Sequence, residues 1–167
     1  MKRLHQHLKR PLAEVRSAVV IAFLVIALLG FADSAFLTVE HYRGVIPPCT
    51  TEGCDTVLTS QYSDIFGIPV SLLGSFYYLM IAIGSFIYLE SRHGRGEVAK
   101  IHSSILKWTF MTTALGFGMS LWFVYLQAFV IHAWCQYCLG SAATSTALFV
   151  VSILILRARL IPTDQTL

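Results

Sequence analysis

Charged residues are scarce in this sequence. Only 13% of its 167 residues are Asp, Glu, Lys or Arg, whereas 56% are hydrophobic. Soluble domains usually contain about 25% charged residues, so this composition excludes an ordinary soluble domain. Basic residues outnumber acidic ones by 12 to 9, which gives a formal net charge of +3. Such a small excess does not indicate a nucleic-acid-binding protein, and we expect no nucleic acid partner.

The sequence also lacks internal repeats, low-complexity linkers and an appended soluble domain. It contains instead four apolar runs of roughly the 20 residues that span a bilayer. They are about Ser17–Val39, Ile68–Leu89, Trp108–Val130 and Leu139–Leu156. We therefore predict an all-α integral membrane protein, in which residues 1–167 form one four-transmembrane-helix bundle within a lipid bilayer.

Small or hydroxyl-bearing residues recur four positions apart within or beside these runs. Residues with this spacing share one helix face and let neighbouring helices approach closely in lipid. The sets are Gly30 with Ser34, Gly67 with Ser71 and Ser75, Thr112 with Gly116 and Ser120, and Gly140 with Thr144. This pattern favours a packed bundle over loosely associated helices.

Lys and Arg are almost missing from two of the connections between the runs. The first connection contains only Arg43, and the third contains neither. The other basic residues lie in the N-terminal tail, the second connection and the C-terminal tail: Lys2, Arg3, Lys9, Arg10, Arg16, Arg92, Arg95, Lys100, Lys107, Arg157 and Arg159. The positive-inside rule then puts both termini and the second connection in the cytoplasm, and the first and third connections outside.

The longest connection, roughly Glu40–Gly67, lies on the outer side in this topology. Its segment 56-TVLTSQY-62 is apolar enough to form a short interfacial helix, and Asp55 is placed to cap that helix. Gly67 and Pro69 mark the start of the second membrane helix, because proline is tolerated in the first turn of a helix.

Cysteine is rare too, and all four cysteines lie in or beside the two outer connections. Cys49 and Cys54 have C-x4-C spacing, and Cys135 and Cys138 have C-x2-C spacing. Disulfides persist in the bacterial periplasm and in the ER lumen. A structural disulfide is one alternative for the first pair, and a buried or zinc-binding pair is one for the second. Covalent haem attachment is excluded, because Leu139 follows Cys138 where histidine is needed.

The C-x2-C pair is expected in the first turn of the fourth helix. The free N–H groups and the positive dipole end at a helix N-terminus favour a thiolate. Thiolates are the attacking species in disulfide exchange. The surroundings of Cys135 and Cys138 do not resemble those of a zinc finger or rubredoxin, and both cysteine pairs lie on the oxidising side, so we favour a redox pair and expect no metal.

Four stretches carry a more specific signal together than any of them does alone. They are 33-DSAFLTVEHY-42, the loop cysteines at 49 and 54, 54-CDTVLTSQYSDIFGIPVSLLG-74, and 135-CQYC-138. A lone C-x-x-C is a weak signal. The run C-D-x-V-L-x-S, followed by F-G-I-P and a late C-x-x-C, resembles the vitamin K epoxide reductase family, specifically its bacterial members. Order and spacing agree with the family over nearly the whole chain.

The resemblance implies a quinone-dependent thiol-disulfide oxidoreductase with a role like that of DsbB. In such a relay Cys49 exchanges with a thioredoxin-like or DsbA-like protein on the outer, periplasmic side of the bacterial plasma (inner) membrane. Cys54 exchanges with Cys135, and Cys138 passes electrons to a membrane quinone (menaquinone, ubiquinone or a vitamin K-like quinone). Ser60 matches a family serine near the active site. The chain ends soon after the fourth run, so we expect a separate partner and no fused thioredoxin domain.

Other candidates come from the residues themselves. Asp33 lies inside the first run, and intramembrane carboxylates are often functional, although such a residue can also be a hydrogen-bonded packing residue. Five apolar or aromatic residues are candidates for a quinone pocket, although such residues also fill ordinary cores: Phe66, Leu72, Leu73, Tyr77 and Phe117.

Two further functions stay open on the sequence alone. One is a quinone or vitamin K epoxide reductase whose main product is the reduced quinone. The other is a membrane metal-binding or scaffold protein with structural disulfides.

Overall fold

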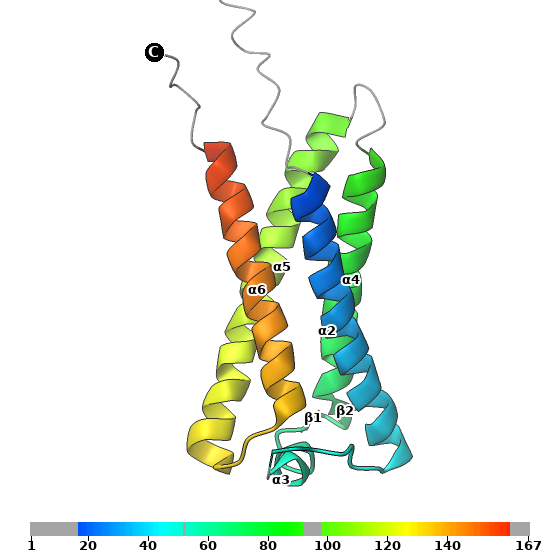
Figure 1. The fold of residues 1–167 in the computed structure, drawn as a ribbon, viewed down its shortest axis with the longest axis vertical. Coiled ribbons are helices and arrows are strands. Elements are labelled where there is room, and N and C mark those ends of the chain that lie inside the picture. Colours follow the sequence, from blue (N-terminus) through cyan, green and yellow to red (C-terminus); the bar gives the residue numbers. More distant parts are fainter. Residues whose placement is uncertain (1–16, 52, 92–97, 161–167) are drawn as a thin grey trace, which may run out of the picture.

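Four long helices stand side by side in the molecule (Figure 1). The computed structural model describes residues 17–51, 53–91 and 98–160. Within these residues the long helices are α2 (Ser17–Arg43), α4 (Val70–Ser91), α5 (Val98–Leu126), which continues into the π-helical turn η2 (Gln127–Ile131), and α6 (Gln136–Leu160). All four contain a segment long and apolar enough to cross a membrane: Ala18–Arg43, Val70–Glu90, Lys107–Ile131 and Gln136–Arg157. The prediction of an all-α, multi-span membrane fold is confirmed.

The ends of the four long helices gather at two opposite poles of the bundle (Figure 1). The first residue of α2, the last of α4, the first of α5 and the last of α6 lie at one pole (Figure 1). The short elements between α2 and α4 lie at the other, which we call the outer end. Several basic residues that set the predicted topology lie outside the described residues: Lys2, Arg3, Lys9, Arg10, Arg16, Arg92 and Arg95.

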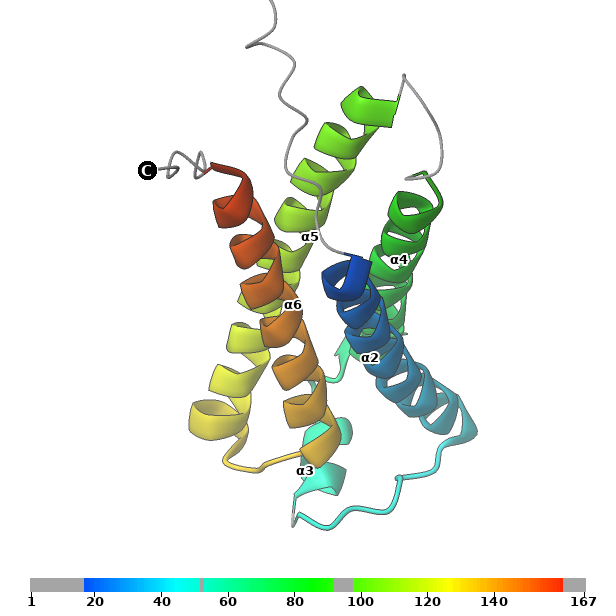
Figure 2. The ribbon, with the colours of Figure 1, turned by 45° about the horizontal axis from the view of Figure 1, so that its top comes forward.

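The outer end is covered by the segment between α2 and α4. It contains the one-turn helix α3 (Cys54–Leu58) and a small hairpin of β1 (Asp64–Ile65) and β2 (Ile68–Pro69). The hairpin is antiparallel, and Ile65 pairs with Ile68. In two views α3 lies below the outer end of α6 (Figures 1 and 2). The chain thus folds back under the bundle before it enters α4.

The predicted bounds of the short outer helix, 56–62, were wrong, and so was the predicted cap. The helix starts at Cys54, and Gly53 precedes it with φ 120°, a conformation that suits glycine. The Gly53 carbonyl accepts the first helical bond, from the Val57 N–H at 3.0 Å. Asp55 therefore lies inside the first turn. The helix ends at Leu58, and the Asp55 carbonyl accepts both the Thr59 N–H at 3.0 Å and the Thr59 hydroxyl at 2.7 Å.

Two adjacent tyrosines of α4 fasten that helix to the other three. Tyr78 is buried against Gly30 of α2, and its hydroxyl is 2.7 Å from the Ser141 carbonyl of α6. Tyr77 lies against Gly116 of α5, and a Cβ added at Gly116 would stand 2.3 Å from the tyrosine ring. Two of the predicted small residues are therefore contact points between helices.

The other predicted small positions differ from these two. A Cβ at Gly140 meets nothing within 4 Å, and Gly67 lies in the hairpin turn with φ 78° rather than in a helix. The spacing of small residues therefore identified some close contacts but did not distinguish them from lipid-facing positions.

Gly30→Ala should destabilise the protein by about 1–3 kcal/mol, the usual range for overpacking. A Cβ at Gly30 would lie 2.3 Å from the Tyr78 ring, so either the tyrosine or α2 must move. The measurement is thermal unfolding in detergent micelles, with Gly118→Ala as the matched control, because a Cβ at Gly118 meets nothing within 4 Å. Equal melting temperatures for the two variants would contradict the tight packing of Gly30 on Tyr78.

Candidate redox site

The four cysteines gather at the outer end of the bundle. Cys49 and Cys54 form a disulfide whose Cα atoms are 6.3 Å apart. Cys135 and Cys138 are free thiols at the start of α6. We call residues 45–58, which carry the disulfide, the outer loop. The molecule thus combines an oxidised pair in the outer loop with a reduced pair at the helix.

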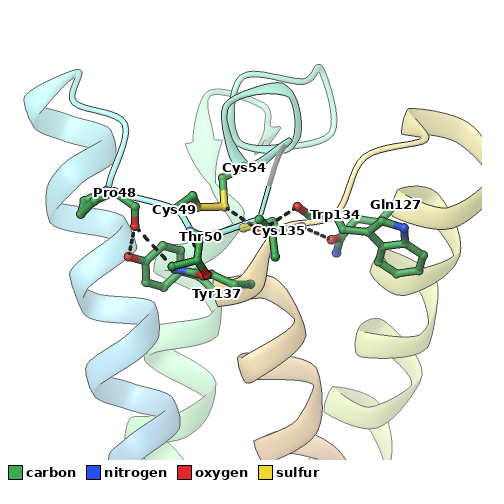
Figure 3. The surroundings of a disulfide bond; sticks show 10 residues. Pro48, Cys49, Thr50, Cys54, Gln127, Trp134, Cys135 and Tyr137 are labelled. Carbon is green, nitrogen blue, oxygen red and sulfur yellow. Dashed lines mark hydrogen bonds between the residues drawn. A yellow bond between two sulfur atoms is a disulfide. The ribbon is translucent and has the colours of Figure 1, made fainter.

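Hydrogen bonds dock the outer loop on the first residues of α6 (Figure 3). The Tyr137 hydroxyl donates to the Pro48 carbonyl at 2.8 Å, and the Thr50 N–H donates to Gln136 Oε1 at 3.2 Å. The Thr50 hydroxyl also donates to that oxygen. Gln136 and Tyr137 are the two residues between the cysteines of the C-x2-C motif. The motif therefore holds the segment around Cys49 directly.

A second set of contacts fixes the other side of the outer loop. The Thr51 hydroxyl donates to the Trp134 carbonyl at 3.2 Å and lies 3.6 Å from the Cys54 sulfur. A Cβ at Gly53 would lie 2.9 Å from Ala133 Cβ, so only glycine allows this approach. The loop is therefore held on both sides of its disulfide.

Cys54 and Cys135 belong to one buried cluster, completed by Val57 of α3. Figure 3 shows the surroundings of the two cysteines. Cys54 is 1% exposed and Cys135 is 0% exposed, whereas Cys49 is half-buried. Disulfide exchange requires a thiolate to reach a disulfide sulfur. The packing puts Cys54 of the outer loop and Cys135 of the C-x2-C pair in the same buried cluster.

Gln127 positions the backbone at Cys135. Its side chain is 2% exposed, and its Oε1 accepts the Cys135 N–H at 2.9 Å. Its own carbonyl accepts the Ala133 N–H at 3.2 Å. Gln127 opens the π-helical turn η2, and such turns frequently occur at functional sites. One residue thereby ties the end of α5 to the start of α6.

Hydrogen bonds make the Cys135 thiol more acidic than an ordinary cysteine. The pKa of Cys135 is lowered to about 7, chiefly because the Cys138 thiol donates a hydrogen bond to its sulfur. Burial raises the pKa and partly opposes this, whereas the backbone N–H groups of Cys138 and Tyr137 lower it further. The carboxylate of Asp33 has a smaller, raising effect. Cys135 is therefore largely a thiolate above neutral pH.

A cavity of about 910 Å³ lies between the helices on the inner side of this site. Cys138 lines it, together with residues of all four long helices and of the segment between α2 and α4. The cysteines of the C-x2-C pair thus have partly different surroundings. Cys135 is buried in the cluster with Cys54, whereas Cys138 packs against that cluster and also borders the cavity.

Of the other predicted site residues, four line the cavity and three do not. Asp33, Ser60, Leu73 and Tyr77 line the cavity. The Ser60 hydroxyl donates to the Val57 carbonyl at 2.8 Å, so it also closes the end of α3.

Three predicted quinone-pocket residues lie elsewhere. Phe66 is fully exposed at the tip of the hairpin, and Phe117 stacks on Phe149 with ring centroids 4.8 Å apart. Leu72 is half-buried on α4 and does not border the cavity. The residues predicted to form the quinone pocket therefore include some that line the cavity and some that face elsewhere.

Residues that the sequence did not single out complete the site. Gln127 is an uncharged polar residue in an apolar run, which is a usable signal for a functional or structural role. Thr50, Thr51 and Gln136 carried no signal of their own, since their partners are distant in the chain.

No group of three or more His, Cys, Asp or Glu side chains in the described part of the chain is placed to hold a metal ion. The zinc alternative therefore draws no support from those residues.

Comparison with known proteins gives two matches. The family model described as the vitamin K epoxide reductase family matches residues 21–153. A protein from Arabidopsis thaliana named thiol-disulfide oxidoreductase LTO1 is 28% identical to the chain over 127 residues. That match covers 72% of this chain and 32% of the Arabidopsis protein, so the chain spans about a third of the length of this relative.

The first proton of the Cys135–Cys138 pair should dissociate with a midpoint near pH 7. Because the pKa is lowered, the thiolate forms as the pH rises through about 7 and is lost below it. Cys138→Ala removes the largest stabilising hydrogen bond, so the midpoint for Cys135 should rise toward the ordinary cysteine value of about 8.5. Thiolate absorbance at 240 nm against pH, with the outer disulfide intact, measures both. Cys138→Ser is the matched control, because its hydroxyl keeps a donor. An unchanged midpoint in Cys138→Ala would contradict the assigned cause.

Proposed function

Because the chain belongs to the vitamin K epoxide reductase family, we propose that it is a membrane thiol-disulfide oxidoreductase that oxidises a thioredoxin-like or DsbA-like protein and reduces a quinone. One observation carries the proposal. Cys54 of the outer disulfide packs on Cys135, while Cys138, two residues into α6, borders a cavity between the helices. This is the order of groups that a relay from an outer thiol protein to a membrane acceptor needs.

Electrons enter the relay at Cys49. The partner's thiolate attacks the half-buried Cys49 sulfur, because Cys54 is 1% exposed and shielded by the packed loop. The Cys49–partner disulfide forms and Cys54 leaves as a thiolate. The partner's second thiol then breaks the mixed disulfide, and the partner departs oxidised while both loop cysteines are reduced.

The inner exchange regenerates the outer disulfide. The Cys54 thiolate attacks Cys135 of an oxidised Cys135–Cys138 pair, and Cys138 leaves. Cys49 then attacks Cys54, and Cys135 leaves as a thiolate. A leaving thiol of lower pKa departs faster, so the lowered pKa of Cys135 favours this step. The products are an outer disulfide and an inner dithiol, the same redox state that the structure holds.

The cavity suits a quinone ring as the electron acceptor. Its volume of about 910 Å³ lies within the range of small-molecule pockets, and apolar residues make up most of its lining. Leu73, Tyr77, Met119 and Phe123 would hold the ring, and Asp33 Oδ2, which has no hydrogen-bond partner among the described residues, offers a polar contact. A bound quinone supplies an acceptor for two electrons and two protons. Menaquinone, ubiquinone and vitamin K-like quinones share this chemistry.

We place the protein in the bacterial plasma membrane with both termini in the cytoplasm and the outer loop in the periplasm. The basic residues of the sequence support this orientation through the positive-inside rule. The oxidising environment of the periplasm suits a disulfide in the outer loop.

The contact between Cys54 and Cys135 can be tested by trapping. In Cys49→Ser/Cys138→Ser each remaining cysteine has lost its own partner, so a Cys54–Cys135 disulfide should form spontaneously on purification. Mass spectrometry of non-reduced peptides identifies the bond. Cys49→Ser/Cys135→Ser is the matched control and should give less Cys54–Cys138 product, because Cys138 is only partly buried against the cluster that contains Cys54 and also borders the cavity. If the control forms its bond as readily, the assigned order of exchange is wrong.

The function itself is tested in lipid nanodiscs with reduced DsbA as the thiol protein and decylubiquinone as the acceptor. The wild-type protein should oxidise DsbA at a rate that depends on the quinone. Cys138→Ser should abolish quinone reduction, because it removes the sulfur at the cavity, but should still form the mixed disulfide between Cys49 and DsbA. Gly118→Ala serves as a folded control. A wild-type protein that leaves DsbA reduced with every quinone tested would refute the proposal.

A further inference from the structure

Asp33 is a carboxylate inside a membrane-spanning helix, and one of its oxygens has no partner. Oδ2 is buried and accepts no hydrogen bond from any described residue. The neighbouring polar residues of α2 are satisfied within the helix: Ser34 donates to the Gly30 carbonyl at 2.8 Å and Thr38 donates to the Ser34 carbonyl at 2.7 Å. A charged group in this setting is costly and is usually retained for function. If this side chain only packed α2 against its neighbours, serine or threonine would do so at a lower desolvation cost.

Asp33 borders the same cavity as Cys138 and lies close enough to influence the thiols. Its carboxylate raises the pKa of Cys135. Among the described residues that line the cavity, the other carboxylate is Asp64, which pairs with His41 at 3.5 Å near the outer rim. Asp33 is thus the unpaired carboxylate on the inner side of the site.

The other titratable side chains that line the cavity either bind to other residues or belong to the segment between α2 and α4. Tyr78 of α4 interacts electrostatically with Asp33, but its hydroxyl is bonded to Ser141 and Thr144 of α6. Tyr77 faces Ser145 at 3.4 Å, and Tyr62 belongs to the segment between α3 and β1. The residues that α5 and η2 contribute to the lining carry no titratable side chain.

We propose that Asp33 carries the proton of the Cys138 thiol to the quinone. This inference rests on the proposed function and names the group that moves the proton. With Cys135 already a thiolate, the pair holds one proton, on Cys138. Formation of the Cys135–Cys138 bond releases two electrons and this proton, which Asp33 Oδ2 accepts and then donates to a quinone oxygen. The second proton of the quinol comes from the outer solvent, which gained one when the Cys135 thiolate formed.

The activity test compares Asp33→Asn with the wild type in a single turnover. The Cys135–Cys138 pair is reduced first and then oxidised by decylubiquinone in nanodiscs. The isosteric amide cannot carry the proton, so the oxidation rate should fall about 100-fold, at the lower end of general acid–base effects. The KM for decylubiquinone should stay nearly constant, and Asp33→Glu should recover part of the rate. Glu40→Gln is the matched control, because Glu40 is a buried carboxylate of the same helix that is paired with Arg43 at 2.9 Å.

A second measurement does not depend on turnover. Infrared difference spectra are recorded between the dithiol and disulfide states of the quinone-free protein, with diamide as the oxidant. The wild type should show a change in the carboxylic acid C=O stretch that Asp33→Asn lacks and Glu40→Gln keeps. A wild type without any such band contradicts the proposal whether or not the variants fold, whereas assignment of a band to Asp33 needs a folded Asp33→Asn variant.

The outcomes separate this inference from the proposed function. If the wild type reduces decylubiquinone and Asp33→Asn does so equally fast, the proposed function stands and the proton role of Asp33 is wrong. The same holds if the wild type shows no carboxylic acid band. If the wild type does not reduce the quinone, the proposed function fails and this inference fails with it.

Discussion

Docking of the outer loop on the start of α6 is the constraint on which the outer end of the molecule depends. Thr50 and Pro48 bind to Gln136 and Tyr137, and Thr51 binds to the Trp134 carbonyl. These bonds hold the outer loop where Cys54 and Cys135 share one buried cluster. Of the two cysteines of the docked loop, Cys49 is half-buried and Cys54 is fully buried.

The C-x2-C motif works at the boundary between two environments because of where its helix begins. Cys135 precedes the first residue of α6 and faces the protein-covered side, while Cys138 lies one turn further in and borders the cavity. The backbone amide of Cys135 is held by Gln127 on the preceding helix. One short turn therefore connects a sulfur buried beneath the outer loop to a sulfur that borders the cavity, and the proposed relay needs no large motion of the helices between them.

Much of the architecture could be predicted from the sequence, because long apolar runs have few structural solutions in a membrane. The four helices follow from those runs, and the redox chemistry follows from the cysteine spacing together with the family motifs. The detail of the site was harder. Nothing local in the sequence shows that Gln136 meets Thr50, since the two are 86 positions apart in the chain.

The remaining differences between prediction and structure concern which face of a helix a residue occupies and how α3 begins. Phe117 and Tyr77 are both aromatic residues near the cavity level, yet Phe117 stacks on Phe149 and only Tyr77 borders the cavity. In lipid both faces of a helix are apolar, so hydropathy alone does not tell them apart. The start of α3 was misplaced because the unusual φ of Gly53, not an Asp55 cap, begins that helix.

The paired tyrosines of α4 have a consequence for motion. Tyr78 inserts at Gly30 of α2 and Tyr77 inserts at Gly116 of α5, while both hydroxyls reach α6. Any rotation or sliding of α4 would disturb contacts with three neighbours simultaneously, and tightly packed interfaces do not deform continuously. The helices should therefore behave as one stiff frame. On the proposed mechanism, movement is then confined to the outer loop and to the hydrogen bonds that dock it on the start of α6.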